Sequence, residues 1–185
     1  MPRHFEQPDR LAIVIPAYRP SDGLADLVRT LSERAAPAIV IVDDGSGPEY
    51  RDVFSRAAAF PNVQLLRHAV NLGKGAALKT AFNHVLCTFP ALAGIVTADA
   101  DGQHHPDDIQ RVADRLMAQP ESLILGSRSF DRDVPLRSRV GNVATRGIMH
   151  GLLGQKLTDT QTGLRGIPAS FLPKLLRHEA TGYEF

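Results

Sequence analysis

The sequence has one cysteine and no long apolar run, and each scarcity removes a class of protein. A single cysteine, Cys87, excludes an internal disulfide framework and suits a reducing, cytoplasmic compartment. No stretch approaches the roughly 18 apolar residues that a membrane-spanning helix needs, and the start MPRHFEQPDR lacks the apolar segment of a signal peptide. We therefore expect a soluble chain in which Cys87 is an inert thiol buried within a helix.

Two common nucleotide-binding signatures are also missing. There is no GxxxxGK[ST] loop and no GxGxxG, so a dinucleotide cofactor is not expected. The net charge of +1 argues against a nucleic-acid partner. The charge is uneven, since residues 1–127 carry 12 basic and 15 acidic side chains, whereas residues 128–185 carry 9 basic and 5 acidic ones. This asymmetry suits a cation in the first part and an anion in the second, and ordinary surface variation explains it equally well.

Five apolar, β-branched runs recur along the chain, and they are continuous rather than alternating. Such runs are typical of strands buried on both faces of a parallel sheet. Helical patterns lie between them, so the order predicts a doubly wound, mostly parallel α/β sheet with helices on both faces. The runs are 11–15, 38–42, 63–66, 94–98 and 122–126, and the helical patterns are 23–34, 48–59, 75–88 and 106–118.

The length fits one domain that follows a tail over residues 1–10. The regular alternation weakens after residue 127, which suggests a nucleotide-binding part over about 11–127 and an acceptor-side part over about 128–185. Within the second part we expect an irregular stretch over 128–138, a helix near 139–153, and then a short strand and another helix.

Ligands of open α/β sheets bind outside the carboxyl ends of the strands, so the polar residues after each run are candidates. The first run ends at Pro16 and Tyr18, and the tyrosine ring either stacks on a flat ligand or simply packs. The second ends at Asp43 and Asp44, which either accept hydrogen bonds from a nucleoside or shape a turn. After the third run a GKG triplet containing Lys74 opens a helix, and its N–H groups can hold an anion.

The fourth run ends in DADGQHH. In an extended backbone, residues two positions apart point to the same side, so Asp99 and Asp101 lie together there. Gln103 joins them if the backbone is extended as far as that residue. Carboxylates this close repel each other unless a proton or a cation intervenes, and oxygen ligands select Mg²⁺ or Mn²⁺. The spacing lacks the Gly and Glu of an EF-hand, and zinc held by His104 and His105 is a poor alternative because adjacent histidines rarely converge. An ordinary turn remains the other interpretation of the two aspartates, and we expect His104 and His105 only to shape the turn into the next helix.

Several arginines follow the fifth run, among them Arg128, Arg137 and Arg139. Arginines opposite a metal can clamp phosphates through their planar guanidinium groups. Each of them alone is equally typical of a solvated surface.

Taken in order, PAYRP, VDDGS, NLGKGAAL, DADGQH, GSR and DTQTGLRG resemble the motifs of family 2 inverting glycosyltransferases. The resemblance is greatest to the dolichyl-phosphate mannose synthase-like branch, which transfers a sugar from a nucleotide to a polyprenyl phosphate. It spans residues 11–185 and implies a GT-A fold with a nucleotide-diphosphate sugar as donor. One departure is Arg19-Pro20, where the family usually has Asn and an acidic residue.

The resemblance also implies roles for residues of this chain. Asp99 and Asp101 are expected to hold Mg²⁺ or Mn²⁺, with Gln103 as a third ligand. Arg128, together with Arg137 or Arg139, is expected to face the pyrophosphate or the acceptor phosphate. The nucleoside or substrate would be bordered by Pro16, Tyr18, Asp43, Asp44, Lys74 and Ala100.

The chemistry expected of the acceptor decides whether a base is needed. A lipid phosphate, with a second pKa of about 6, is already largely anionic at neutral pH, whereas a glycan hydroxyl needs a general base. Asp159 is the candidate base in that second case. A nucleotidyltransferase and a non-catalytic nucleotide-binding module are further alternatives. For transfer to a lipid phosphate, we expect a cytoplasmic protein that associates with the membrane face. Its relatives continue past the position of Phe185 into amphipathic or membrane helices.

Overall fold

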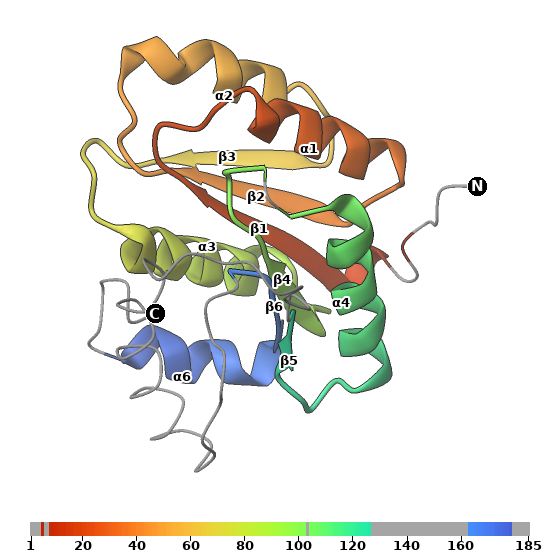
Figure 1. The fold of residues 1–185 in the computed structure, drawn as a ribbon. Helices are drawn as coiled ribbons and strands as arrows, with labels where there is room; N and C mark the ends of the chain where they lie inside the picture. Colours follow the sequence, from red (N-terminus) through yellow and green to blue (C-terminus); the bar gives the residue numbers. More distant parts are fainter. Residues whose placement is uncertain (1–4, 6–7, 103, 127–162, 179–185) are drawn as a thin grey trace, which may run out of the picture.

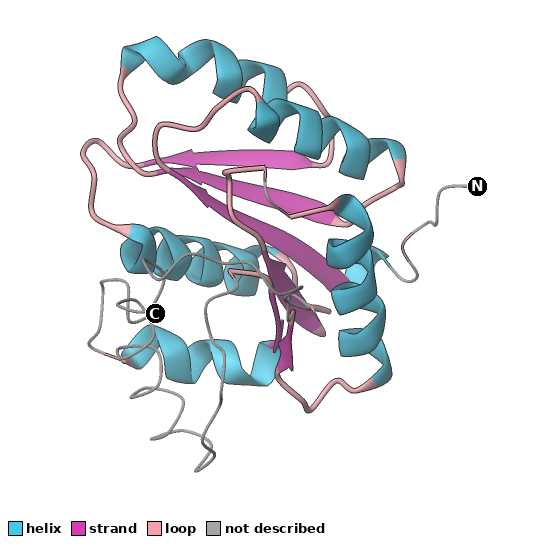
Figure 2. Ribbon diagram, in the orientation of Figure 1, coloured by secondary structure: helices cyan, strands magenta, loops and turns pink. Residues whose placement is uncertain are grey.

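The structure is a computed structural model that describes residues 5, 8–102, 104–126 and 163–178. These residues form a six-stranded sheet with helices on both faces (Figures 1 and 2). The strand order is β3-β2-β1-β4-β6-β5. The strands are β1 (Leu11–Ala17), β2 (Ala38–Asp43), β3 (Val63–Arg67), β4 (Gly94–Thr97), β5 (Ile124–Leu125) and β6 (Arg165–Pro168).

The sheet is parallel except at one side. Strand β1 pairs in parallel with β2 and β4, and β2 pairs in parallel with β3. Strand β6 runs antiparallel to β4, and β5 runs antiparallel to β6. The predicted doubly wound, mostly parallel sheet is therefore confirmed. The fifth run forms only the short edge strand β5, and β6 from the predicted acceptor-side part lies between it and β4.

The helices follow the predicted patterns closely, and none in the described part of the chain is long and apolar enough to cross a bilayer. The predicted helix over 139–153 lies outside the described residues. The α-helices are α1 (Gly23–Glu33), α2 (Arg51–Ala57), α3 (Lys74–Thr88), α4 (Pro106–Ala118) and α6 (Leu172–Arg177), and short 3-10 turns cover Pro8–Arg10, Pro48–Tyr50 and Ala169–Phe171.

Strand β1 shows why the apolar runs are continuous. Its residues Ile13 and Ile15 pack in one core with α1, α2 and α4, whereas Ala12 and Val14 pack on the other face with α3 and α6. Both faces are thus covered by helices (Figure 1). A strand with two buried faces has no solvent side, so it needs no alternating polar residues.

The expectation that Cys87 is buried is wrong, because its side chain is exposed. The buried stripe of α3 includes Leu78, Ala81, Phe82 and Val85. At 3.6 residues per turn, the position two residues after Val85 points away from that stripe. The apolar character of cysteine does not override this geometry.

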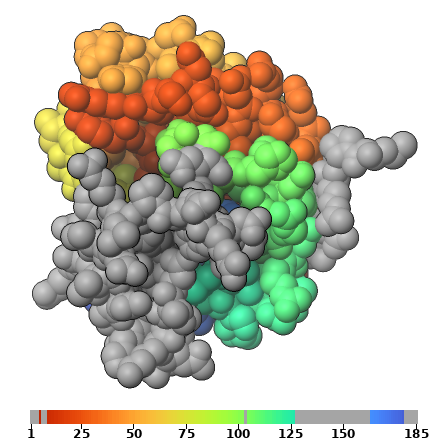
Figure 3. All heavy atoms as spheres, in the orientation of Figure 1, coloured from red at the N-terminus to blue at the C-terminus, as the bar shows by residue number. Residues whose placement is uncertain are grey.

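The turn that follows β4 lies between α1 and α4, as the surface view also shows (Figure 3). Helix α4 begins with Pro106 after His105, whose side chain accepts a hydrogen bond from the N–H of Asp107 at 3.3 Å. The same Asp107 pairs with Arg34 near the end of α1 at 2.5 Å. These contacts fix the two helices on either side of the turn that carries the paired aspartates.

Candidate active site at the carboxyl end of the sheet

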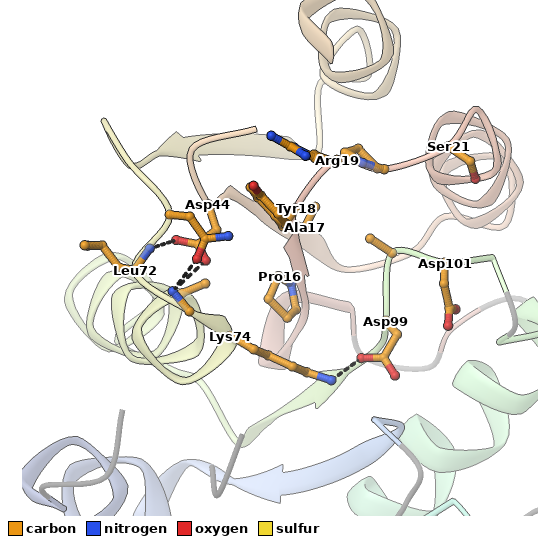
Figure 4. Close-up of a pocket in the computed structure, with 15 residues that line it drawn as sticks. Pro16, Ala17, Tyr18, Arg19, Ser21, Asp44, Leu72, Lys74, Asp99 and Asp101 are labelled. Atoms are coloured by element: carbon orange, nitrogen blue, oxygen red, sulfur yellow. Dashed lines mark hydrogen bonds and ion pairs between the residues drawn. The ribbon is translucent and has the colours of Figure 1, made fainter. Parts of the chain in front are cut away.

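A pocket of about 730 Å³ opens where β1 and β4 end and α3 begins (Figure 4). Its volume falls within the roughly 300–1,000 Å³ of small-molecule sites, and its place is the edge where ligands of open α/β sheets bind. The structure therefore brings together residues that are far apart in the sequence. The predicted site residues that line the pocket are Pro16, Tyr18, Asp44, Lys74, Asp99, Ala100 and Asp101.

Two exposed apolar side chains belong to the pocket lining. Tyr18 is 45% exposed and Leu72 is 56% exposed, so each has surface that a flat ligand would cover. The guanidinium of Arg19 lies 5.0 Å from the centre of the Tyr18 ring. Arg19 has a left-handed backbone with φ of 51°, and its N–H donates to the Ser46 hydroxyl at 2.9 Å. The residue that departs from the family pattern thus stacks on the candidate base-binding tyrosine.

Asp43 does not line the pocket. It is buried, and its Oδ1 accepts a hydrogen bond from the N–H of Ser46 at 2.9 Å. Its other oxygen lies 3.9 Å from Nε of Arg67. This geometry is that of a turn-forming residue, which is one of the two interpretations that the sequence allowed.

Asp44 lines the pocket, but most of its hydrogen-bonding capacity is used by the protein. Its Oδ1 accepts from the N–H of Leu72 at 2.9 Å and lies 2.7 Å from Nδ1 of His68. Its Oδ2 accepts from the N–H of Gly73 at 2.8 Å. The carboxylate is only 4% exposed and ties the end of β2 to the loop before α3.

Asp99 lies between two cationic or potentially cationic groups, and Figure 4 shows its contact with the first of them, Lys74. Lys74 Nζ is 2.5 Å from its Oδ1, and His104 Nε2 is 3.4 Å from its Oδ2. Burial acts to raise the pKa of Asp99, but the hydrogen bond of His104 and the charge of Lys74 together outweigh it and hold this pKa well below its ordinary value. Asp99 is therefore an anion at neutral pH. His104, expected only to shape the turn, is a buried contact of this carboxylate.

Gly163 closes the site from the side of β6, and sequence reasoning gave it no role. The Thr97 hydroxyl donates to its carbonyl oxygen at 2.7 Å, which draws this segment against the end of β4. A Cβ atom at position 163 would lie only 2.1 Å from Oδ2 of Asp99. Glycine is thus required for the close approach of this backbone to the carboxylate.

Arg165 was also missed as a site residue. It pairs with Thr97 across β6 and β4 and is half-buried near Asp99. Burial lowers the pKa of its guanidinium, and the charge of Asp99 acts in the opposite direction. The TGLRG segment was the available signal, but a sequence cannot show that β6 inserts beside β4.

The arrangement of Asp99 and Asp101 fits a hard divalent cation. Strand β4 ends at Thr97, so the extended-backbone argument does not apply, but the turn still places both aspartates on the pocket. Both side chains offer carboxylate oxygens, the ligands that hard divalent cations select, and one oxygen of Asp99 is paired with the Lys74 ammonium. Within the described ranges no three His, Cys, Asp or Glu side chains converge. The expected third ligand, Gln103, lies outside the described residues, as do Arg128, Arg137, Arg139 and Asp159.

A mostly parallel sheet with a pocket at the carboxyl ends of its strands is the arrangement found in GT-A glycosyltransferases. The fold agrees with that of glucosyl-3-phosphoglycerate synthase from Mycobacterium tuberculosis, solved in complex with Mn²⁺, UDP and glucosyl-3-phosphoglycerate. The TM-score is 0.59 at 16% identity, over 87% of this chain and 57% of that one. The predicted GT-A fold is confirmed.

The sequence matches the family model for Glycosyl transferase family 2 over residues 12–174, so the chain belongs to this family and is a glycosyltransferase. It is 30% identical over 180 residues to the UDP-N-acetylglucosamine–dolichyl-phosphate N-acetylglucosaminyltransferase of Methanococcus voltae, covering 88% of this chain and 71% of that protein. It is 26% identical to the undecaprenyl-phosphate 4-deoxy-4-formamido-L-arabinose transferase of Edwardsiella ictaluri, where it spans 54% of the relative's length. The family resemblance seen in the motifs is confirmed.

Proposed function

We propose that this chain transfers a sugar, with inversion, from a nucleotide-diphosphate sugar to a polyprenyl phosphate of the undecaprenyl or dolichyl type. The observation that carries the proposal is that Asp99, Asp101 and Lys74 line one pocket together with Tyr18. Membership of family 2 supports glycosyl transfer. The names of the Methanococcus voltae and Edwardsiella ictaluri relatives support a lipid-phosphate acceptor.

For the donor, we place the nucleobase against Tyr18 and Leu72 and the diphosphate beside Lys74. Lys74 begins α3, where the positive end of the helix dipole and the N–H groups of the first turn favour an anion. Its ammonium is paired with Asp99. A donor diphosphate can take over the lysine, and Asp99 then becomes available to a divalent cation.

We assign Asp99, Asp101 and Gln103 as the residues that would hold Mg²⁺ or Mn²⁺. Asp99 suits this role because it is anionic and already cation-bound. The Mn²⁺ in the structural neighbour from Mycobacterium tuberculosis supports the use of a divalent cation. When bound, such a cation neutralises the negative charge of the leaving nucleoside diphosphate.

For the acceptor, an oxygen of the lipid phosphate attacks the anomeric carbon from the face opposite the leaving diphosphate. A new C–O bond forms as the bond to the diphosphate breaks, and the configuration inverts. The phosphate is largely anionic at neutral pH and needs no general base. It needs positive charge, which Arg165 supplies near Asp99 and for which Arg128, Arg137 and Arg139 are the further candidates.

We place the reaction at the cytoplasmic face of a membrane. The donor is a water-soluble nucleotide sugar, whereas the acceptor is anchored by its hydrocarbon chain. The two meet at the surface of the bilayer. A catalytic domain of this kind needs a pocket open to water, and the described pocket has exposed side chains on its lining.

The test is a transfer assay with the purified chain, Mn²⁺, a panel of UDP- and GDP-sugars and a short-chain polyprenyl phosphate, with the anomeric configuration of the product determined by NMR. Asp99→Asn is expected to lower turnover at least about 100-fold. Asp108→Asn is the matched control, because Asp108 lies on the outside of α4 and pairs with Arg111. Full activity of Asp99→Asn would contradict the site, and transfer to glycan hydroxyls instead of the lipid phosphate would contradict the acceptor.

A further inference from the structure

A partly buried histidine, His68, lies near the pocket without lining it. Its Nδ1 lies 2.7 Å from Oδ1 of Asp44, and its Nε2 lies 2.9 Å from the hydroxyl of Thr80. A carboxylate only accepts hydrogen bonds, so Nδ1 carries the proton and donates to Asp44. In the neutral ring Nε2 then accepts the Thr80 hydroxyl. A continuous chain of hydrogen bonds therefore runs from the second turn of α3, through His68, to Asp44.

At its Asp44 end, this series of hydrogen bonds holds the loop between β3 and α3. Asp44 accepts the N–H groups of Leu72 and Gly73, the two residues that precede Lys74. The loop also lies directly on Gly45, because a Cβ there would come within 2.3 Å of the carbonyl carbon of Val70. Gly45 has φ of 69°, a conformation that favours glycine. The loop is thus hydrogen-bonded by one residue and packed against the next.

We propose that His68 is a positioning residue for the donor nucleotide. Oriented by Thr80, it fixes the Asp44 carboxylate, which holds the backbone of Leu72 and Gly73. The position of this backbone in turn sets the positions of Leu72 in the pocket wall and of Lys74 at the start of α3. His68 touches no substrate itself, so its contribution is to donor binding and not to bond making. This role rests on the proposed use of the pocket for a nucleotide-diphosphate sugar.

Substitutions can separate the contributions of the two hydrogen bonds that the His68 side chain makes. His68→Leu removes both, whereas His68→Asn keeps an N–H donor near the position of Nδ1. Thr80→Val removes the group that orients the ring, and Thr80→Ser keeps it. We expect His68→Leu to weaken donor binding about tenfold or more, which is the scale of losing a hydrogen bond to a charged group. His68→Asn and Thr80→Ser should stay within about threefold of the unmodified protein, with Thr80→Val in between.

Helix α3 offers a matched control in His84. Its Nε2 bonds to Oε1 of Gln64, so His84 joins α3 to β3. Like His68, it is partly buried. It does not belong to the pocket lining. His84→Leu is therefore expected to cost a comparable hydrogen bond while leaving nucleotide affinity unchanged.

The affinities for UDP and for GDP are measured by titration calorimetry with Mn²⁺, together with kcat and KM for the nucleotide sugar that is turned over and the melting temperature of each variant. The role predicts that KM rises in His68→Leu with kcat nearly constant, and that Asn restores it. It is overturned if His68→Leu binds as tightly as the unmodified protein, if Asn does no better than Leu, or if kcat falls at constant KM. If the unmodified protein binds neither nucleotide, the proposed function fails and this role fails with it. Nucleotide binding that His68→Leu weakens, without sugar transfer, supports the positioning role and contradicts only the proposed reaction.

Discussion

Replacing Gly163 by alanine tests whether Asp99 is clamped between β4 and β6. The added Cβ would lie 2.1 Å from Oδ2 of Asp99, whereas ordinary van der Waals contact begins at 3.4 Å. Either the carboxylate or the backbone must therefore move by about 1.3 Å. The Thr97 hydroxyl resists movement of the backbone, because it bonds to the carbonyl oxygen of Gly163. We expect the carboxylate to turn away, which breaks its contact with Lys74.

A displacement of this size is large for a metal ligand, since such sites tolerate about 0.2 Å in their distances. We expect Gly163→Ala to weaken Mn²⁺ binding by about 10- to 100-fold, the scale seen when the groups that orient a ligand are lost. Overpacking should also cost about 1–3 kcal/mol of unfolding free energy. The Mn²⁺ affinity is measured by electron paramagnetic resonance of the free ion, and stability by urea denaturation.

Gly23→Ala is the control for this substitution. Its Cβ would meet only the Ser21 hydroxyl at 3.3 Å and Cα of Gly102 at 3.7 Å, although Gly23 also lies beside the turn that carries Asp101. Mn²⁺ affinity should survive this change. Unaltered Mn²⁺ binding in Gly163→Ala would refute the clamp, and absence of binding in the unmodified protein would refute the metal assignment itself.

Three further predictions concern single side chains. Arg165→Met should raise the KM for the lipid phosphate about tenfold or more, because it removes a charged hydrogen-bond donor. The KM of Arg165→Lys should lie between those of the unmodified protein and Arg165→Met. Equal KM values would show that this arginine does not bind the acceptor. In EDTA, the low pKa of Asp99 contributes stability that is complete above about pH 4, the pKa in the unfolded chain, and is lost as the pH falls toward the pKa in the folded protein. The urea midpoint of the unmodified protein should therefore fall more steeply between pH 6 and pH 2.5 than that of Asp99→Asn. Parallel curves would contradict the lowered pKa. Exposed Cys87 should react with a thiol reagent in the native protein nearly as fast as in urea, whereas strong protection would contradict its exposure.

Much of the fold was predictable because its signals are local. Continuous apolar runs marked the central strands, and the 3.6-residue stripe together with Pro106 and the acids after it marked α4 to the residue. The same local chemistry indicated Asp99 and Asp101 as a pair and Lys74 at a helix start. Each of these follows from neighbours within a few positions along the chain.

The errors and omissions have the opposite character. Cys87 was expected to be buried because cysteine usually is, but its angle on α3 decides its exposure. Gly163 and Arg165 received no role because they meet Thr97 on β4 only in the folded protein. Gly163 accepts the Thr97 hydroxyl at a separation of 66 positions in the sequence, and Arg165 lies opposite Thr97 in the β4–β6 pairing. His104 was assigned to a turn although its ring reaches back to Asp99.

The sequence by itself determined the class of fold, the order of its elements and the residue types at the strand ends, since hydrophobic periodicity and turn chemistry act at short range. The tertiary structure decided which of those residues meet. Packing alone brings Lys74 to Asp99, lays β6 against the end of β4, and makes Asp44, which lines the pocket, also the support of a loop. These contacts join segments tens of residues apart, and the positions of the helices on the two faces of the sheet set their distances.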